Sequence, residues 1–314
     1  MKRLAVVGVT GLVGQSVLDV LKEECLADKF ELYLFGSERS AGKKFDYNGK
    51  SYVLLKLDDS SLDIGFDYAI FLTDELVSGC WVKKFAERGT VVIDNSSAFR
   101  LDKNVPLIVP EINIRKLEKN NRIIANPNCS TIQLVVVLAK LRQLGVFETI
   151  VVSSYQSVSG AGKDALDDLK NGTTNVFEKE IKDNFIAKIG KISDNLNCSE
   201  ENKIILETQK ILNEKINIVA TTVRVPISFC HGESVYVKFK DKVDFEMVNE
   251  VLNCEYIEVG DLFCPNDCVG SNQTFVCRLR KVSETELVFF VIADNLRRGA
   301  SYNAVKILME IIKD

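Results

Sequence analysis

The sequence predicts an α/β protein, with a doubly wound parallel sheet in its first part and a second, α+β part that contains a mixed sheet. In the first third of the chain, short apolar runs of strand type alternate with segments of helical periodicity, a pattern typical of parallel sheets. In the second half, strand-like runs follow one another with fewer helical segments between them, which favours antiparallel or mixed pairing. At 314 residues the chain is long enough for about two domains.

The first part begins with a strand and a helix. Residues 4–9 form a continuous apolar run, as expected of a strand that is buried on both faces. Residues 12–24 follow with apolar side chains at helical spacing. Further strands are expected at 31–35, 52–57, 68–72, 91–93 and 123–125, and a helix is expected at 75–88.

The second part is predicted to begin with a long helix over residues 130–144. Residues 171–201 are polar and rich in Asn and Lys, and they are expected to form loops and short helices. Residues 296–312 have an amphipathic pattern that predicts a closing helix. Strands are expected at 149–155, 217–224, 234–240, 274–279 and 286–293.

Composition and charge restrict the class of protein. Hydrophobic residues are 46% and charged residues 27%, which excludes a disordered chain, and the net charge of −4 argues against a general nucleic-acid binder. The apolar runs are far shorter than the ~20 residues that cross a bilayer, so a soluble protein is expected. The apolar start resembles a secretion signal but is interrupted by Gly8, Thr10 and Gly11. The nine scattered cysteines indicate reduced thiols in the cytoplasm.

A glycine-rich turn follows the first predicted strand and opens the first predicted helix. Its sequence is Gly8-Val9-Thr10-Gly11-Leu12-Val13-Gly14, a variant of the dinucleotide-binding fingerprint of Rossmann-type domains. Glycines allow the tight turn and let the backbone approach a pyrophosphate, which would lie at the helix N-terminus. The alternative is a plain strand–helix turn without a ligand.

The residues after the second predicted strand indicate NADP as the cofactor. Domains that bind NAD carry Asp or Glu about twenty residues after the glycines, where the acid binds the ribose hydroxyls. This chain has Ser37, Arg39 and Ser40 there, and hydroxyls with a guanidinium suit a 2′-phosphate. Glu38 lies between them and is the one feature that favours NAD.

Cys129 and His231 are candidate catalytic residues. Cys129 follows a turn-forming Asn-Pro-Asn sequence and precedes an apolar helical run, so we expect it at a helix N-terminus, where the dipole stabilises a thiolate. His231, the single histidine, is expected in a loop after Arg224, a charged residue that ends an apolar strand. The alternatives are a structural cysteine and a structural histidine. A zinc site with unpaired ligand spacing is a weaker alternative for Cys254, Cys264, Cys268 and Cys277.

Motifs along nearly the whole chain, in the right order, resemble those of the aspartate-semialdehyde dehydrogenase family. The segment 175–201 departs from the family by lacking its proline-containing sequence. The motifs are Gly8–Gly14, Ser37-x-Arg39-Ser-Ala-Gly42, Asp94-Asn-Ser-Ser-Ala-Phe-Arg100, Asn126-Pro-Asn-Cys129-Ser-Thr-Ile-Gln, Tyr155-Gln-Ser-Val-Ser-Gly-Ala-Gly162, Arg224-Val-Pro, Glu233-Ser-Val and Asp294-Asn-Leu-Arg-Arg-Gly-Ala300.

The resemblance implies a role for each matching residue. It implies that Cys129 is the nucleophile, that His231 is the general acid/base and that Gln156 orients the acyl intermediate. Arg224 would hold the carboxylate of the substrate, and Glu200 its amino group. Further substrate residues are Asn128 and the two phosphate ligands Arg100 and Lys203, of which Lys203 is assigned with Glu200 through the E-x-x-K spacing. Further cofactor residues are Thr10, Leu12, Val13, Ser159, Gly160 and Asn295.

The resemblance also implies the reaction and the assembly. The reaction is the reversible reductive dephosphorylation of aspartyl 4-phosphate to aspartate 4-semialdehyde with NADP, through a cysteine thioester, on the route to lysine, threonine and methionine. Residues 1–127, completed by the C-terminal helix 295–314, would form the dinucleotide-binding domain, and residues 128–294 the catalytic and dimerisation domain. A homodimer is expected, with a dimer of dimers as an extension, and neither a metal nor a nucleic-acid or membrane partner.

Two alternatives to this function are left open. N-acyl-glutamyl-phosphate reductase also pairs a cysteine with a histidine. A catalytically silent relative that serves as a binding protein is disfavoured by the presence of Cys129, Gln156, Arg224 and His231 together.

Overall fold

The computed structural model describes residues 1–313. The chain divides into two compact units. The first contains residues 1–127 and the C-terminal residues from Ala300 onward, and the second contains Asn128–Gly299.

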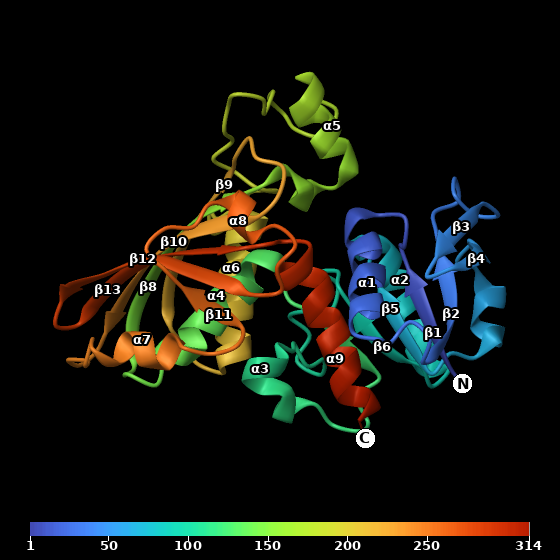
Figure 1. The fold of residues 1–314 in the computed structure, drawn as a ribbon, viewed down its shortest axis with the longest axis horizontal. Coiled ribbons are helices and arrows are strands. Elements are labelled where there is room, and N and C mark those ends of the chain that lie inside the picture. Colours follow the sequence, from blue (N-terminus) through green and yellow to red (C-terminus); the bar gives the residue numbers. More distant parts are fainter. Residues whose placement is uncertain (314) are drawn as a thin grey trace. The chain divides into compact units, whose positions relative to one another are not determined.

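The first unit is built on a parallel sheet, which confirms the predicted Rossmann-type fold (Figure 1). The strand order is β2-β1-β5-β6-β7, and each neighbouring pair is parallel. These strands are β1 (Lys2–Val7), β2 (Phe30–Phe35), β5 (Tyr68–Phe71), β6 (Val91–Asp94) and β7 (Ile123–Ala125). The helices are α1 (Leu12–Glu23), α2 (Glu75–Glu87), α3 (Pro110–Asn113) and α9 (Tyr302–Ile312).

Consecutive residues of the strands are apolar and buried, because helices cover both faces of this sheet. Leu4 belongs to a core cluster shared with Leu21 of α1 and Leu308 of α9. On the opposite face, the ring of Phe71 meets that of Phe85 of α2 edge-on, with 5.1 Å between centroids. Because β1 is parallel to both β2 and β5, the carboxyl ends of these strands lie at one edge of the sheet. Ligands bind at this edge in open α/β sheets.

One prediction in this unit was wrong. Residues 52–57 do not form a strand of the main sheet, because β4 (Lys50–Val53) pairs with β3 (Lys44–Tyr47) in a separate antiparallel hairpin. The hairpin turns at Asn48-Gly49, with φ of 49° and 74°, the left-handed conformation that an Asn-Gly turn adopts readily. Leu55 then makes an isolated parallel bridge with Phe35 at the end of β2.

The second unit contains the predicted mixed sheet. Its strand order is β11-β12-β13-β10-β8-β9, with parallel pairs at the two ends and antiparallel pairs between them. The strands are β8 (Phe147–Gln156), β9 (Asn217–Arg224), β10 (His231–Phe239), β11 (Ile257–Val259), β12 (Thr274–Ser283) and β13 (Glu286–Ala293). The helices are α4 (Cys129–Leu141), α5 (Lys163–Asn171), α6 (Ser199–Leu212), α7 (Met247–Leu252) and α8 (Pro265–Cys268).

Helix α4 forms the centre of this unit, because it packs against β10, β12 and β13 of the sheet and against α6. Its run from Ser130 to Leu138 is buried, which explains why its sequence is apolar rather than amphipathic. Helix α6 packs in turn against β9. The two helices thus bring their first turns to the ends of the strands where the candidate site residues lie.

Two further expectations are corrected. His231 is the first residue of β10 rather than a loop residue, because its backbone already pairs with Gln156 of β8 and Ala293 of β13. The single closing helix predicted over 296–312 is instead a π-helical turn at Arg297–Ser301 followed by α9.

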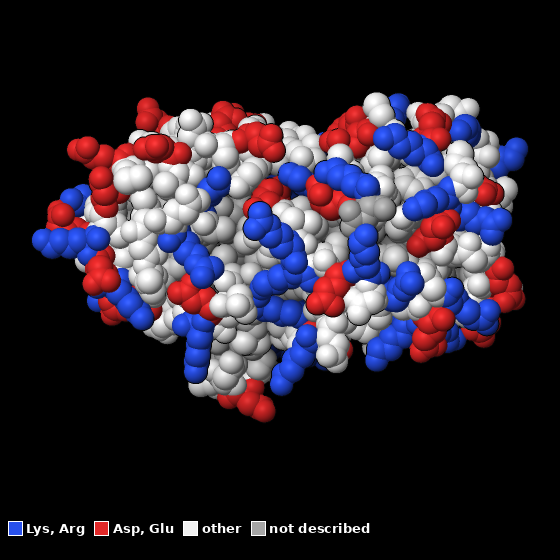
Figure 2. All heavy atoms as spheres, turned by 90° about the horizontal axis from the view of Figure 1, so that it is seen from below, with Lys and Arg blue, Asp and Glu red and all other residues white. Residues whose placement is uncertain are grey.

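The surface carries charges of both signs. Figure 2 shows Lys and Arg side chains interspersed with Asp and Glu over the face in view, in keeping with the small net charge. Among the helices of residues 1–313, none has the length and apolar character required to span a membrane.

Candidate active site

Cys129 is the first residue of helix α4, at the positive end of the helix dipole. Oδ1 of Asn128 caps this helix by accepting hydrogen bonds from the backbone N–H of Ser130 at 3.0 Å and of Thr131 at 3.4 Å. The thiol of Cys129 is partly exposed. A partly exposed thiol in this position is favourable for a thiolate nucleophile.

The backbone around Cys129 is held closely by residues that the sequence did not single out. The N–H of Asn128 donates to Oε2 of the buried Glu207 on α6 at 2.7 Å. A Cβ atom built on Gly299 would lie 2.9 Å from Cβ of Cys129, closer than such atoms approach in proteins. Gly299 therefore allows the turn before α9 to pass directly over the candidate nucleophile.

Glu200 lies at the start of α6 and contacts three other candidate residues. Its Oε1 accepts hydrogen bonds from Nδ2 of Asn128 at 2.9 Å and from Nε2 of Gln156 at 3.2 Å. Its Oε2 lies 3.1 Å from Nζ of Lys203, one turn further along the same helix. The predicted E-x-x-K pair is therefore an ion pair on one helix face.

The charge of Glu200 is strongly favoured at this position. Burial alone raises the pKa of the carboxyl, but the Lys203 charge, the Asn128 hydrogen bond and the Arg224 charge outweigh it and lower the pKa to about 2. Only 8% of the Glu200 side chain is exposed. A buried carboxylate that stays ionised at neutral pH can bind a cation inside the site.

Arg224 ends strand β9 and is buried. Its Nη1 donates to the carbonyl oxygen of Ser157 at 2.6 Å. Burial lowers the pKa of the guanidinium, while the neighbouring charges of Glu200 and Cys129 oppose that shift. Glu200, Arg224 and Cys129 therefore lie close enough for their charges to act on one another.

The side chains of Arg224 and His231 both approach Gly160. A Cβ atom built on Gly160 would lie 3.1 Å from Nη1 of Arg224 and 3.2 Å from Nε2 of His231. Both side chains thus reach the same short turn, Val158–Ala161, which follows β8. A side chain at Gly160 would fill the space that these two groups border.

His231 is buried and held through Nδ1. The backbone N–H of Ser157 donates to Nδ1 at 3.0 Å, so the neutral ring carries its proton on Nε2. Among residues 1–313, Nε2 has no hydrogen-bond partner. Burial and the nearby Arg224 charge lower the pKa of His231 to about 3. His231 is therefore a neutral imidazole with an N–H group available for a ligand.

Asn295 fixes the turn that holds His231. Its Oδ1 accepts hydrogen bonds from the backbone N–H of Cys230 at 3.0 Å and from the hydroxyl of Ser157 at 3.1 Å. Its Nδ2 donates to the hydroxyl of Ser159 at 3.0 Å. Ser159 and Asn295, which were expected to bind the cofactor, are buried and tied to this scaffold.

The first unit has a hollow beside the glycine turn. This hollow of about 480 Å³ lies at the carboxyl ends of β1, β2 and β5. Gly8 has φ of 91°, and a Cβ atom built on Gly14 would lie 2.3 Å from the carbonyl oxygen of Gly8, so both positions require glycine. The hollow is lined by Val7, Gly8, Thr10, Gly11, Gly36, Ser37, Glu38, Lys56, Leu57, Leu72, Thr73, Asp74, Val77 and Trp81.

These residues fit a dinucleotide. The glycine turn leads into the N-terminus of α1, whose N-cap, Gly11, has no side chain that could occupy the anion position. In the turn that follows β2, Ser37 and Ser40 face one another, with 3.2 Å between their hydroxyl oxygens. Arg39 lies exposed on the same turn. Arg100 also belongs to the first unit, where its Nε and Nη2 donate to the carbonyl oxygens of Asn126 and Asn95.

Comparison with known proteins agrees with this arrangement. Residues 3–120 match the semialdehyde dehydrogenase NAD binding domain, and residues 138–298 match the semialdehyde dehydrogenase dimerisation domain. The chain is 40% identical to the aspartate-semialdehyde dehydrogenase of Aquifex aeolicus, over 99% of this chain and 98% of that protein. The chain belongs to the aspartate-semialdehyde dehydrogenase family.

Other members of the family support this assignment. The Bacillus subtilis aspartate-semialdehyde dehydrogenase is 38% identical over 99% of this chain and 97% of that protein. The crystal structure of aspartate semialdehyde dehydrogenase II from Vibrio cholerae, complexed with ASA, superposes with a TM-score of 0.94. It is 36% identical and covers 100% of this chain and 99% of that chain. The chain is thus an oxidoreductase of this family.

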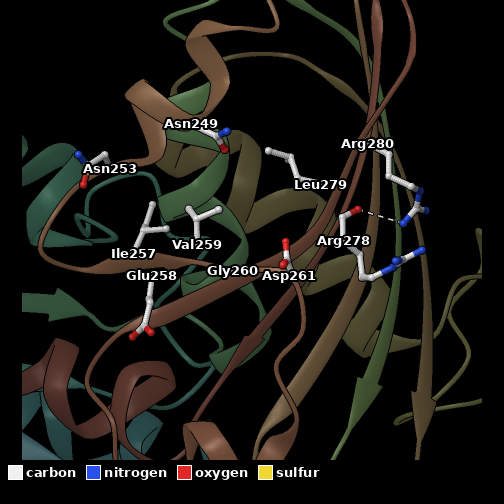
Figure 3. Close-up of a pocket in the computed structure, with 10 residues that line it drawn as sticks. All are labelled: Asn249, Asn253, Ile257, Glu258, Val259, Gly260, Asp261, Arg278, Leu279 and Arg280. Atoms are coloured by element: carbon white, nitrogen blue, oxygen red, sulfur yellow. Dashed lines mark hydrogen bonds between the residues drawn. The ribbon is translucent and has the colours of Figure 1, made fainter.

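One hollow of the second unit lies away from the candidate residues. It measures about 810 Å³ and lies beside β11, β12 and α7. In Figure 3, Leu279 points toward Asn249 and Val259, whereas Arg278 and Arg280 point the opposite way. The dashed line in the figure is the hydrogen bond from Nη1 of Arg280 to the carbonyl oxygen of Arg278. The hollow contains none of the residues expected to be catalytic.

The zinc alternative gains no support from the described part of the chain. Within residues 1–313, no group of three or more His, Cys, Asp or Glu side chains could hold a metal ion. Cys268 is buried and its thiol donates to the carbonyl oxygen of Cys264 at 3.4 Å, as expected of a structural cysteine.

Sequence reasoning missed one buried acid beside the site. Glu233 on β10 is fully buried, with the side chain of Gln133 beside its carboxyl group. Burial raises the pKa of this carboxyl well above its usual value, and the Glu200 charge adds to the shift. Burial therefore favours the protonated form of Glu233. The Glu-Ser-Val motif contains it, and the available signal was the alternation of the strand, because Glu233 lies on the same face as the buried Val235 and Val237.

Proposed function

We propose that this chain catalyses the reversible, NADP-dependent conversion of aspartate 4-semialdehyde and phosphate into aspartyl 4-phosphate. One observation carries the proposal: the buried side chains of Glu200, Arg224 and His231 lie near the partly exposed thiol of Cys129. Family membership sets the substrate class, and the geometry suggests what each residue does. In the cell the reaction would run toward the semialdehyde, which leads to lysine, threonine and methionine.

Cys129 would act as the nucleophile. Its thiolate, favoured by the α4 N-terminus and the positive charge of Arg224, adds to the aldehyde carbon and leaves an alkoxide on the former carbonyl oxygen. When bound, NADP supplies the hydride chemistry by accepting or returning a hydride. Loss of hydride from the carbon of this adduct leaves a thioester on Cys129. Phosphate then attacks the thioester carbon, and the thiolate leaves as aspartyl 4-phosphate is released. Because the mechanism needs a reduced thiol, a cytoplasmic location suits it.

His231 would donate a hydrogen bond from Nε2 to the carbonyl oxygen of the substrate. Because Nδ1 already accepts a hydrogen bond and the pKa is lowered to about 3, the neutral ring offers Nε2–H as a donor. A preorganised donor of this kind stabilises the alkoxide while it is present. Gln156, whose Nε2 is held by Glu200, would keep the acyl group oriented.

The two ends of the substrate suit the two buried charges. Arg224 can bind the α-carboxylate through its planar guanidinium. Glu200 can accept the α-ammonium, because its carboxylate stays ionised in the buried site. Lys203, which now pairs with Glu200, and Arg100 would supply the positive charge for phosphate.

We propose a homodimer formed through the exposed face of the second sheet. Val151 and Tyr155 of β8 and Val219 of β9 are 37%, 39% and 51% exposed on this face. The apolar side chains Val235 and Val237 of β10 are buried and do not belong to this face. Light scattering at micromolar concentration should give the dimer mass, and Val219→Lys should shift it toward the monomer. A monomeric wild-type protein would refute the proposal.

The competing function is reduction of an N-acylated acyl phosphate. An acylated amine is neutral and cannot pair with the Glu200 carboxylate, so such a substrate would leave a buried charge without its partner. The test is an assay of NADPH formation with phosphate and either aspartate semialdehyde or N-acetyl-glutamate semialdehyde. The proposal predicts that kcat/KM is orders of magnitude higher for aspartate semialdehyde. Comparable values, or a preference for the acetylated aldehyde, would assign the chain to the competing function.

A further inference from the structure

Lys56 and Glu38 form an ion pair at the edge of the dinucleotide hollow. Nζ of Lys56 lies 2.9 Å from Oε1 of Glu38, and both residues line the hollow. Their side chains are 52% and 81% exposed. An ion pair so exposed to solvent contributes little to stability, so it can open at small cost when a ligand arrives.

The backbone holds Lys56 beside the end of β2. Gly36 N–H donates to the carbonyl oxygen of Leu55 at 3.1 Å, and Leu55 N–H donates to that of Leu34 at 2.9 Å. These bonds form the isolated parallel bridge between Leu55 and Phe35. They fix Lys56 next to Ser37 and Glu38, the position where Rossmann-type domains contact the 2′ oxygen of the adenosine ribose.

A 2′-phosphate at this position would require the positive charge of Lys56. Arg39 and Glu38 neighbour one another on the turn, so their charges offset, and Asp74, which also lines the hollow, adds a negative charge. Without Lys56, a doubly charged 2′-phosphate would face a set of side chains with no net positive charge. Lys56 gives these side chains a positive charge that can bind the 2′-phosphate.

We propose that Lys56 and Glu38 form the specificity-determining pair for the 2′ position of the cofactor, with Lys56 binding the 2′-phosphate of NADP and Glu38 opposing it. This inference rests on the proposed function, because it assumes that the hollow binds a dinucleotide. Glu38 accepts a hydrogen bond from a 2′-hydroxyl, so it favours NAD, and it competes with the phosphate for Lys56. The two side chains therefore move the NADP:NAD affinity ratio in opposite directions.

The sequence supplies its own probe of binding. Trp81 is the single tryptophan of the chain, and it lines the same hollow. Its ring is held under Nζ of Lys84 at 4.3 Å from the centroid. Titration of its fluorescence with NADP and with NAD gives both dissociation constants without turnover.

The test compares three variants in this titration. Lys56→Met should weaken NADP binding by about tenfold, as expected from the loss of one charge-assisted contact, and leave NAD binding within about twofold. Glu38→Gln should tighten NADP binding and weaken NAD binding. Lys50→Met is the matched control, because Lys50 forms a similar exposed pair with Asp28, at 3.1 Å, and does not line the hollow. It should change neither constant.

Two results distinguish a failure of this inference from a failure of the proposed function. If both cofactors bind but Lys56→Met leaves their affinity ratio unchanged, the inference is wrong and the proposed function stands. If neither NADP nor NAD changes Trp81 fluorescence and equilibrium dialysis also finds no binding, the proposed dinucleotide site is wrong, and the inference falls with it.

Discussion

The backbone N–H of Ser157 donates a hydrogen bond to Nδ1 of His231 across 3.0 Å, and this contact sets the protonation state of the ring. A donor at Nδ1 disfavours the imidazolium, which would carry a proton there. Burial acts in the same direction, and together with the charge of Arg224 it lowers the pKa of His231 to about 3. The ring is therefore neutral, with its N–H group at Nε2.

The pH profile of kcat/KM should accordingly show no histidine step between pH 5 and 8. His231 stays neutral down to about pH 3, and Glu200 stays ionised down to about pH 2, so neither titrates in this window. The rate of Cys129 alkylation by iodoacetamide, measured over the same range, identifies any step that belongs to the thiol. A step near pH 6.5 in kcat/KM that is missing from the alkylation profile would contradict the neutral histidine.

Glu233→Gln should change the pH dependence of stability. The folded-state pKa of Glu233 is raised by burial, so the native chain keeps a proton that the unfolded chain releases above about pH 4.3. Native stability then falls as the pH rises above that value, by about 1.4 kcal/mol per pH unit for one proton, until the folded-state pKa is reached.

The Gln variant lacks this term, because an amide carries no titrating proton. Urea unfolding at several pH values between 5 and 8 should show that its stability relative to wild type increases with pH. Glu258→Gln, a change at an exposed glutamate of the same sheet, is the control and should show no such trend. Parallel pH curves for wild type and Glu233→Gln would mean that Glu233 is ionised in the folded protein.

Gly160→Ala should reduce turnover more than it reduces stability. The added Cβ would lie 3.1 Å from Arg224 Nη1 and 3.2 Å from His231 Nε2, so both groups must move by a few tenths of an ångström. Displacement of two groups that contact the reacting substrate is expected to lower kcat/KM by roughly ten- to a hundredfold. Gly79→Ala on α2 is the control, because a Cβ there meets open space. Equal kinetics for wild type and Gly160→Ala would show that the turn does not shape the site.

Arg224→Lys should raise KM for aspartate semialdehyde and lower kcat/KM by about tenfold or more. An ammonium cannot reproduce the planar, two-pronged contact of a guanidinium with a carboxylate. The Trp81 titration with NADP should be unchanged. Arg142→Lys provides the control, since Arg142 pairs with Glu214 at 3.3 Å on the partly exposed surface of the same unit. If Arg224→Lys affected cofactor affinity but left KM unchanged, Arg224 would not bind the substrate carboxylate.

Much of the fold follows from local sequence patterns. Buried parallel strands such as residues 4–7 are continuous apolar runs, and the turn after them has no room for side chains at Gly8 and Gly14. The hairpin of β3 and β4 was missed because its strands are short and largely exposed, so they lack apolar alternation. Its Asn48-Gly49 turn was the available signal.

The candidate site was harder to predict, because its geometry depends on contacts between distant segments. The motifs named Cys129, Glu200 and His231, yet only the packing of α4 and α6 on the sheet shows that Glu200 connects Asn128 with Gln156. The closeness of Gly299 to Cys129 spans 170 residues, and no local pattern reports it. The ion pair of Lys56 with Glu38 was invisible for the same reason.

The covalent role of Cys129 can be read directly from the mass of the chain after one turnover without phosphate. The protein is mixed with aspartate semialdehyde and NADP, quenched in acid within seconds, digested and analysed by mass spectrometry. The account predicts a burst of NADPH, at most one per active site, and an aspartyl thioester on the peptide that contains Cys129. Cys80→Ala, a change at an exposed cysteine, should leave the burst intact, and Cys129→Ala should abolish it. A burst that persists in Cys129→Ala, or an acyl group on another cysteine, would contradict the account.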